Sequence, residues 1–234
     1  MSFLSLGVFA YLLDGLGWIF YFLSIVSGPI AIVGTLSAAY PALTVLFASF
    51  FLGESLQSIQ YIGVILVITG CIGLAYTPPD ETAGSTVKRV IGSQWIPLSF
   101  IALVLWASAQ TIVKYSYGFP KASEVNLAVC NTVGGMLTLG VYGWMRGRQG
   151  KHSGMEWVKS FLPMGMMAGG DLGVIIANRF GPISIVTPIT GAYPVVTLGF
   201  AWMFLKERIS RLQLLCVVAI FLGMVLATLI PSSA

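Results

Sequence analysis

The sequence predicts an all-α fold, a polytopic bundle of membrane-crossing helices. Of the 234 residues, 57% are hydrophobic and only 9% are charged, and the mean hydropathy is +0.91. Soluble domains carry about 25% charged residues. Apolar runs close to the ~20 residues that cross a ~30 Å hydrocarbon core recur along most of the chain. We therefore expect an integral, multi-pass protein of the lipid bilayer, with the plasma (inner) membrane as its location.

Eight transmembrane helices are expected, one for each apolar run. The runs cover residues 3–26, 31–52, 58–76, 95–117, 122–145, 160–178, 183–204 and 212–230. The first run has no charged segment before it and no small-residue cleavage site after it, so we interpret it as a helix and not as a removable signal peptide. The second and seventh runs each follow a Gly-Pro pair and end at a glutamate, in FLGE and FLKE. The polar stretch 77–94 predicts a connecting loop.

An internal repeat relates two parts of the chain. Between Gly28 and Gly70, 17 of 43 positions are identical to the residue 153 positions later. A chain of this composition should give roughly one match in ten. The chain crosses the membrane five times between 31–52 and 183–204, an odd number, so the two copies run in opposite directions. Inverted repeats of this kind are typical of secondary transporters, whose two halves give alternating access to one site.

The two copies are unequal in length. Three predicted helices precede Gly181 within the second copy, whereas one precedes Gly28. We therefore predict a first, incomplete repeat over 1–76 with three helices, a connecting loop over 77–94, and a second repeat over 95–230 with five helices.

The repeated motif carries a family resemblance. Its pattern, GPIxIVxxxxxxYPxxTxxFAxxFLxE followed by an apolar helix with Gly70 or Gly223, resembles the EamA-like branch of the drug/metabolite transporter superfamily. The resemblance covers nearly the whole chain. It implies an inverted five-plus-five helix bundle with the substrate site between the halves. Compared with that arrangement, the chain lacks the first two of ten helices.

Two aspartates are the first candidates for a substrate-binding or coupling site. Asp14 and Asp171 each lie near the middle of an apolar run, in the helix just before the Gly-Pro pair of their own repeat. A charge inside a bilayer costs about 2.5–3.5 kcal/mol on insertion scales, so such residues have a function or a partner. The offsets from the Gly-Pro pairs differ by one helical turn, which predicts that both face one cavity. The alternative is a structural ion pair with Lys114.

Other polar groups in the predicted helices complete the candidate site. Tyr40 and Tyr193 are equivalent in the repeat, and each precedes a proline, Pro41 or Pro194, that we expect to kink its helix and form part of a gate. Three further side chains are candidates for contact with substrate: Gln110, Lys114 and Asn131. Pro and hydroxyl residues also occur in membrane helices for packing alone, so a structural role stays open for the repeated positions.

Together these features predict a secondary transporter that moves a small metabolite or drug-like solute, ion-coupled or by exchange. The expected partners are a small-molecule substrate, protons as candidate coupling ions, the lipid bilayer and a second copy in a candidate homodimer, with no nucleic acid. No phosphate-binding loop, HExxH or GxSxG motif occurs, so we expect no enzyme, no cofactor and no metal. The alternatives are a non-transporting scaffold or truncated subunit, and a membrane-embedded lipid-modifying enzyme.

Overall fold

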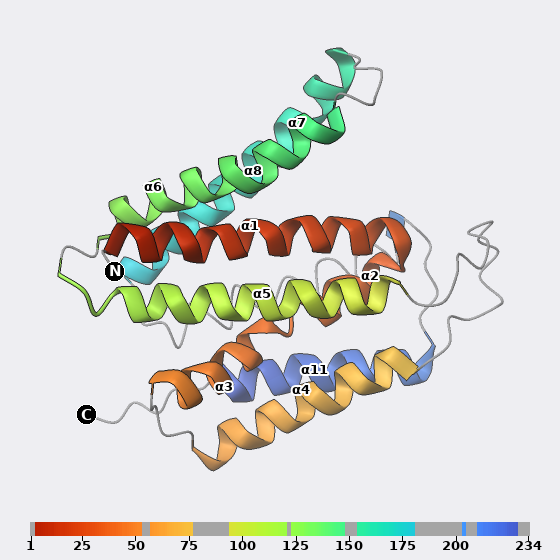
Figure 1. The fold of residues 1–234 in the computed structure, drawn as a ribbon. Helices are drawn as coiled ribbons and strands as arrows, with labels where there is room; N and C mark the ends of the chain where they lie inside the picture. Colours follow the sequence, from red (N-terminus) through yellow and green to blue (C-terminus); the bar gives the residue numbers. More distant parts are fainter. Residues whose placement is uncertain are drawn as a thin grey trace.

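The computed structural model describes residues 3–52, 57–76, 94–120, 123–147, 154–180, 203–204 and 210–228. Every regular element in these residues is helical, which confirms the predicted class (Figure 1). The elements, in chain order, are α1 (Phe3–Ser27), α2 (Ile30–Ser37), α3 (Tyr40–Leu52), α4 (Ser58–Tyr76), α5 (Trp95–Ser116), α6 (Glu124–Gly135), the π-helix η1 (Met136–Gly140), α7 (Val141–Gly147), α8 (Gly154–Phe180) and α11 (Arg211–Thr228). The predicted run 183–204 lies outside the described residues except for Met203 and Phe204.

Three of the described helical runs are long and apolar enough to cross a membrane. They are Phe3–Ser27, Trp95–Ser116 and the continuous run Glu124–Gly147, which joins α6, η1 and α7. Shorter apolar stretches lie in α3, α4 and α11. Helix α8 begins at Gly154, six residues before the predicted start of its run at residue 160. The protein is therefore a helical membrane bundle.

The run predicted as one helix over 31–52 is divided in two. Helix α2 ends at Ser37, and α3 begins at Tyr40 after a turn formed by Ala38 and Ala39. The cause is Pro41, which has no N–H to donate to the carbonyl of Ser37 four residues earlier. Starting a new helix at Tyr40 places the proline in a first turn, where its missing donor costs nothing. The run therefore does not form one continuous α-helix: a two-residue turn divides it at the proline, and the backbone hydrogen bonds from Ala38 to Gly34 and from Ala42 to Ala39 continue through this turn.

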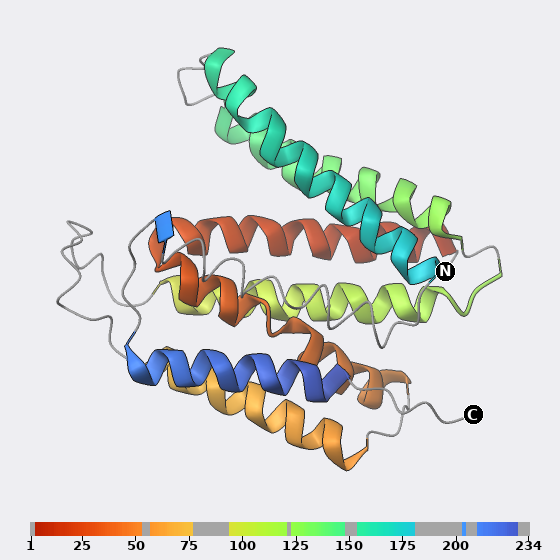
Figure 2. The same cartoon turned by 180° about the vertical axis from the view of Figure 1, so that it is seen from behind.

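The helices form layers that can be followed from the top to the bottom of Figure 1. Helices α6 to α8 lie on one side of α1, and α1 lies along α5. Helix α2 runs from the end of α1 past α5, and α3 lies between α5 and the pair formed by α4 and α11, as also seen from behind in Figure 2. The C-terminal end of α1 meets the N-terminal end of α5, where Ser24 contacts Trp95, and the middles of the two helices meet where Asp14 contacts Trp106. Helices α1 and α5 are therefore antiparallel.

A serine pair joins α1 to α5 inside the bundle. The Ser24 hydroxyl donates to the carbonyl oxygen of Trp95 at 2.8 Å, and its Oγ lies 2.6 Å from Ser99 Oγ. Both serines are fully buried. Small polar side chains of this kind let two membrane helices approach closely and bond across the contact.

Ser24→Ala should destabilise the folded protein only modestly. Interhelical hydrogen bonds in membranes are worth about 0.6 kcal/mol on average, and Ser99 keeps its bond to the carbonyl of Trp95 at 2.9 Å. Thermal unfolding in lipid nanodiscs would measure the change. Ser108→Ala is the matched control, because Ser108 bonds to Val104 within its own helix. An unfolding shift from Ser24→Ala no larger than that of the control would contradict the structural role of the pair.

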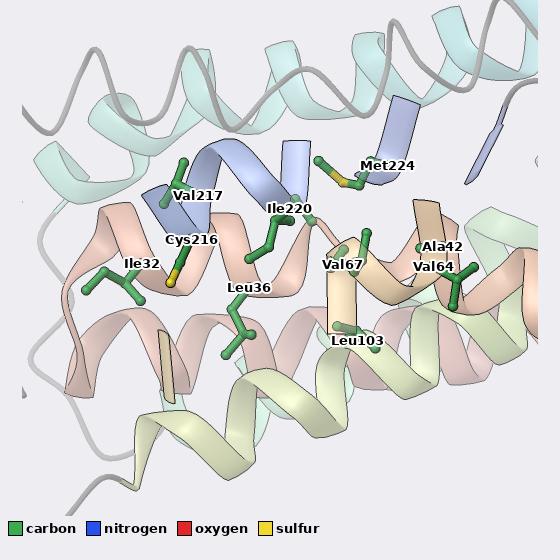
Figure 3. Packing of buried hydrophobic residues seen from close by; sticks show 12 residues of the cluster. Ile32, Leu36, Ala42, Val64, Val67, Leu103, Cys216, Val217, Ile220 and Met224 are labelled. Atoms are coloured by element: carbon green, nitrogen blue, oxygen red, sulfur yellow. The ribbon is translucent and has the colours of Figure 1, made fainter. Parts of the chain in front are cut away.

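The hydrophobic core lies where α2, α3, α4, α5 and α11 meet (Figure 3). Its buried members are Ile32, Leu36, Ala38, Ala39, Ala42, Val64, Val67, Leu103, Cys216, Val217, Ile220 and Met224. Residues from both copies of the repeat therefore build one core, which the inverted arrangement requires.

Within this core α4 and α11 cross at two glycines. A Cβ placed on Gly70 would lie 2.6 Å from Ile220 Cγ1 and 2.9 Å from the carbonyl oxygen of Cys216. A Cβ placed on Gly223 would lie 2.6 Å from the carbonyl oxygen of Gly63 and 2.8 Å from Val67 Cγ2. Only glycine allows this approach, because the backbone of the other helix occupies the space of a side chain.

Candidate functional site

The direction of Asp14 follows from what the other positions of α1 contact. One face of α1 packs on α6 and η1: Gly7 lies against Cys130, and Gly15 lies against Thr138 of η1. Another face packs on α5, where Gly17 lies against Trp106. At 100° per residue, Asp14 falls between these two faces. Its half-buried side chain therefore points toward the junction of α5 and α6.

An aromatic cluster surrounds Asp14. It consists of Trp18 and Tyr21 of α1, Tyr40 of α3 and Trp106 of α5. The ring centroids of Trp18 and Trp106 are 4.9 Å apart, and those of Tyr21 and Tyr40 lie 5.3 Å and 5.8 Å from Trp106. The Trp106 indole N–H donates to the backbone carbonyl of Asp14 at 3.2 Å. Trp106 is buried and forms the centre of the cluster.

The carboxylate of Asp14 has its own partner in this cluster. The indole N–H of Trp18, one turn further along α1, donates a hydrogen bond to it. A neutral donor satisfies one lone pair and leaves the negative charge uncompensated. The carboxylate thus stays able to bind a proton or a positively charged group.

Asp171 of α8 reaches the same region. Its charge acts on Asp14 and on the hydroxyls of Tyr11 and Tyr40, so it lies within electrostatic range of all three. Its side chain is half-buried on a helix whose described residues from 154 to 173 are otherwise largely exposed. The two aspartates come from parts of the chain on either side of the stretch 77–94. Asp171 is thus linked to Asp14 and Tyr40 by charge at a distance, while the described packing of its helix α8 is on α6.

The polar candidates of α5 and α6 are placed differently. Gln110 and Lys114 are exposed on α5, and Asn131 is half-buried on α6. Trp106 is the α5 residue level with Asp14, and Lys114 follows it by eight residues, or about 12 Å of helix. Because α1 and α5 are antiparallel, Lys114 is thus level with the N-terminal end of α1 and not with Asp14.

Two of the four repeated gate residues can be placed. Tyr40 and Pro41 begin α3, immediately after the break between α2 and α3. The Oγ of Ser37, at the end of α2, is buried and has no hydrogen-bond partner in the described part of the chain. Tyr193 and Pro194 lie outside the described residues. A buried hydroxyl without a described hydrogen-bond partner therefore lies at the end of α2, three residues before Tyr40.

Sequence reasoning missed four aromatic members of this region, Tyr11, Trp18, Tyr21 and Trp106. A signal for three of them was present, because Tyr11, Asp14, Trp18 and Tyr21 are spaced by three or four residues and so share one face of a helix. For Trp106 no local signal exists, since only the packing of α5 on α1 brings it there. Metal binding has no support in the described residues, where no three His, Cys, Asp or Glu side chains gather.

The described helices form a membrane bundle with acidic and aromatic side chains in its interior. The model of the EamA-like transporter family matches residues 1–76 and 93–229. The protein belongs to the EamA-like transporter family, whose membership identifies it as a membrane transporter of small solutes. Members of this family are transporters and not enzymes.

Comparison with solved structures supports the fold. One crystal structure matches with a TM-score of 0.55 at 18% sequence identity, over 96% of this chain and 87% of its own. At this identity the likeness shows the fold alone. The comparison with curated proteins gave no match.

Proposed function

We propose that the protein is a secondary transporter in which Asp14 and Asp171 bind the solute and the coupling proton. The observation that supports the proposal is the presence of two half-buried carboxylates, one on α1 and one on α8, within electrostatic range of each other. Each carboxylate in a bilayer costs about 2.5–3.5 kcal/mol, and a pair multiplies that cost. Packing alone does not explain why two such carboxylates are present. As the location we propose the plasma (inner) membrane, because it carries the proton gradient that a coupled transporter uses.

The pair also suggests how coupling works. Two neighbouring negative charges repel, and binding of one proton or one cationic group relieves the repulsion. Release of the bound proton on the other side of the membrane would restore the pair for the next cycle. Asp14 belongs to the first copy of the repeat and Asp171 to the second. A movement of one copy relative to the other would therefore change the distance between the carboxylates and hence their affinity for the proton.

Asp171→Asn should lower proton-coupled transport at least about tenfold, as expected when an interaction of a charged group is lost. Asparagine keeps the shape of aspartate and removes its charge. The measurement is proton flux into proteoliposomes with an internal pH dye, after addition of amino acids, polyamines, sugars or aromatic amines one at a time. Glu156→Gln is the matched control, because Glu156 is an exposed acid in the first turn of the same helix.

The transporter proposal fails if none of these solutes moves protons through the wild-type protein. It also fails in its site assignment if Asp171→Asn and Glu156→Gln have equal flux. A scaffold would give the first result while the protein remained folded.

A further inference from the structure

Five residues in the middle of one membrane span form a π-helix. Within the continuous run Glu124–Gly147, η1 covers Met136–Gly140, and the N–H of Val141 donates to the carbonyl of Met136, five residues earlier. Before η1 the span is α-helical, and the N–H of Met136 donates to the carbonyl of Thr132, four residues earlier. The π-turn therefore holds one residue more than an α-turn. Such turns are rare, and many of them lie at functional sites.

The side chain of Thr138 holds this wide turn. Its hydroxyl donates to the carbonyl oxygen of Gly134 at 2.7 Å, and the side chain is buried. In an α-helix that carbonyl would accept from the N–H of residue 138 itself. The hydroxyl thus occupies an acceptor that the backbone needs for an α-turn, which is how threonine side chains compete with helical hydrogen bonds.

The same threonine ends a series of contacts between the span and α1. Three contacts follow one another at intervals of four residues on each helix: Gly7 with Cys130, Tyr11 with Gly134, and Gly15 with Thr138. The last contact is close, since a Cβ placed on Gly15 would lie 2.9 Å from the Cβ of Thr138. Gly15 directly follows Asp14. The span is therefore fixed to α1 up to η1, and the final contact lies beside the candidate site.

Past η1 the span leaves α1. Figures 1 and 2 show α6 lying along α1, whereas α7 and α8 lead away from it. None of the described residues of α7 is buried. A Cβ placed on Gly143 of α7, or on Gly154 or Gly165 of α8, meets nothing within 4 Å. Because regions with few packing contacts move at small cost, η1 is the boundary between a fixed part and a lightly packed part of the span.

We propose that η1 is a joint at which α7 turns relative to α6, by changing between the π form and an α form. Loss of the π-turn shifts the residues that follow by one position, which turns α7 by about 100° and moves it about 1.5 Å along its axis. The Thr138 hydroxyl holds the π form, and a shift of α1 at Asp14 acts on it through Gly15. The inference goes beyond the proposed function, because it concerns the shape of the span whichever solute is carried.

The turn of α7 can be measured as a distance between two spin labels. The labels are attached at Met145→Cys on α7 and Phe9→Cys on α1, both exposed positions, in a Cys71→Ala background. The protein is held in lipid nanodiscs, and the distance is recorded by double electron–electron resonance. A label about 5–6 Å from the helix axis moves by up to about 8 Å when the helix turns by about 100°. Thr138→Val keeps the shape of the side chain and removes its hydroxyl, so it should shift the distance by several ångströms.

A second threonine of the same span is the matched control. Thr132 is exposed on α6, and its hydroxyl donates to the carbonyl of Ala128 at 3.0 Å. Thr132→Val thus removes the same kind of bond outside η1 and should leave the distance unchanged. Thr138→Ser keeps the hydroxyl and should also retain the wild-type distance. Equal distances in Thr138→Val, Thr132→Val and the wild type would overturn the inference.

A deletion decides the question if Thr138→Val does not fold. Removing Leu139 takes away one residue of η1, and a span that can adopt the α form absorbs this loss. The deletion should therefore leave α7 in place and the label distance as in the wild type. A shift toward 8 Å would show that the π-turn persists and would overturn the joint. Both measurements are made without solute or proton gradient, so their outcome is independent of the transporter proposal.

Discussion

Replacing Asp14 with asparagine should lower proton-coupled transport by about 100-fold, which corresponds to a loss of nearly 3 kcal/mol. The expected effect is larger than that of Asp171→Asn because Asp14 lies inside the aromatic cluster, whereas Asp171 lies on the more exposed helix α8. The Trp18 N–H can still donate to the oxygen of asparagine, so the local structure is kept. The charge and the exchangeable proton are lost. Proton flux in proteoliposomes measures the effect.

The conservative variant separates chemistry from packing. Asp14→Glu keeps the charge and moves it by one methylene, so part of the transport should remain while Asp14→Asn has almost none. If both variants are equally inactive and both melt at lower temperature, the position is structural. Unchanged flux in Asp14→Asn would show that the carboxylate takes no part in coupling.

Replacing Gly223 with leucine should prevent stable assembly of α4 and α11. Even the Cβ of an added side chain would lie 2.6 Å from the carbonyl oxygen of Gly63, and a backbone atom cannot move aside as a side chain can. The helices would have to separate, opening the core that Val67, Ile220 and Met224 fill. Overpacking of a core typically costs 1–3 kcal/mol, and a leucine against backbone should reach at least the upper end, about 3 kcal/mol. Thermal unfolding and size-exclusion chromatography in detergent would show this as a low melting temperature or aggregation.

A second glycine provides the control. A Cβ placed on Gly165 of α8 meets nothing within 4 Å, so Gly165→Leu adds the same side chain in open space. The control should unfold at nearly the wild-type temperature. Equal melting temperatures for Gly223→Leu and Gly165→Leu would contradict the close crossing of α4 and α11.

The long helices could be predicted because apolar length alone defines a membrane segment. Helices α1, α4, α5 and α11 begin and end within two residues of the predicted runs. The break between α2 and α3 was read as a kink, since a proline in an apolar run is compatible with either outcome. Which outcome occurs depends on the surrounding helices, here on the burial of Ala38 and Ala39 in the core. The π-helix η1 likewise has no signal in its sequence, MLTLG.

The candidate site could be predicted only for the residues whose presence in a membrane is costly. Asp14 and Asp171 were predicted for that reason, and in the structure they lie within electrostatic range of each other. Aromatic residues carry no such cost, so Trp18 and Trp106 were read as ordinary apolar residues of their helices. Their role depends on the rotation of α1 against α5, which is set by Gly17 and Ser24 and by their partners across the contact. Tertiary contacts of this kind are not visible in one helix alone.

The crossing of α4 and α11 has the form of an interface between two copies of one protein. Positions 63 and 67 correspond to positions 216 and 220 in the repeat, so Gly70 meets the counterparts of the residues that Gly223 meets. Such isologous contact, in which residue i meets j and j meets i, is the hallmark of a two-fold dimer. Here it is made within a single chain. The two repeats therefore associate as two subunits of a dimer do. Because both repeats belong to one chain, the partner is always present and its concentration never limits assembly.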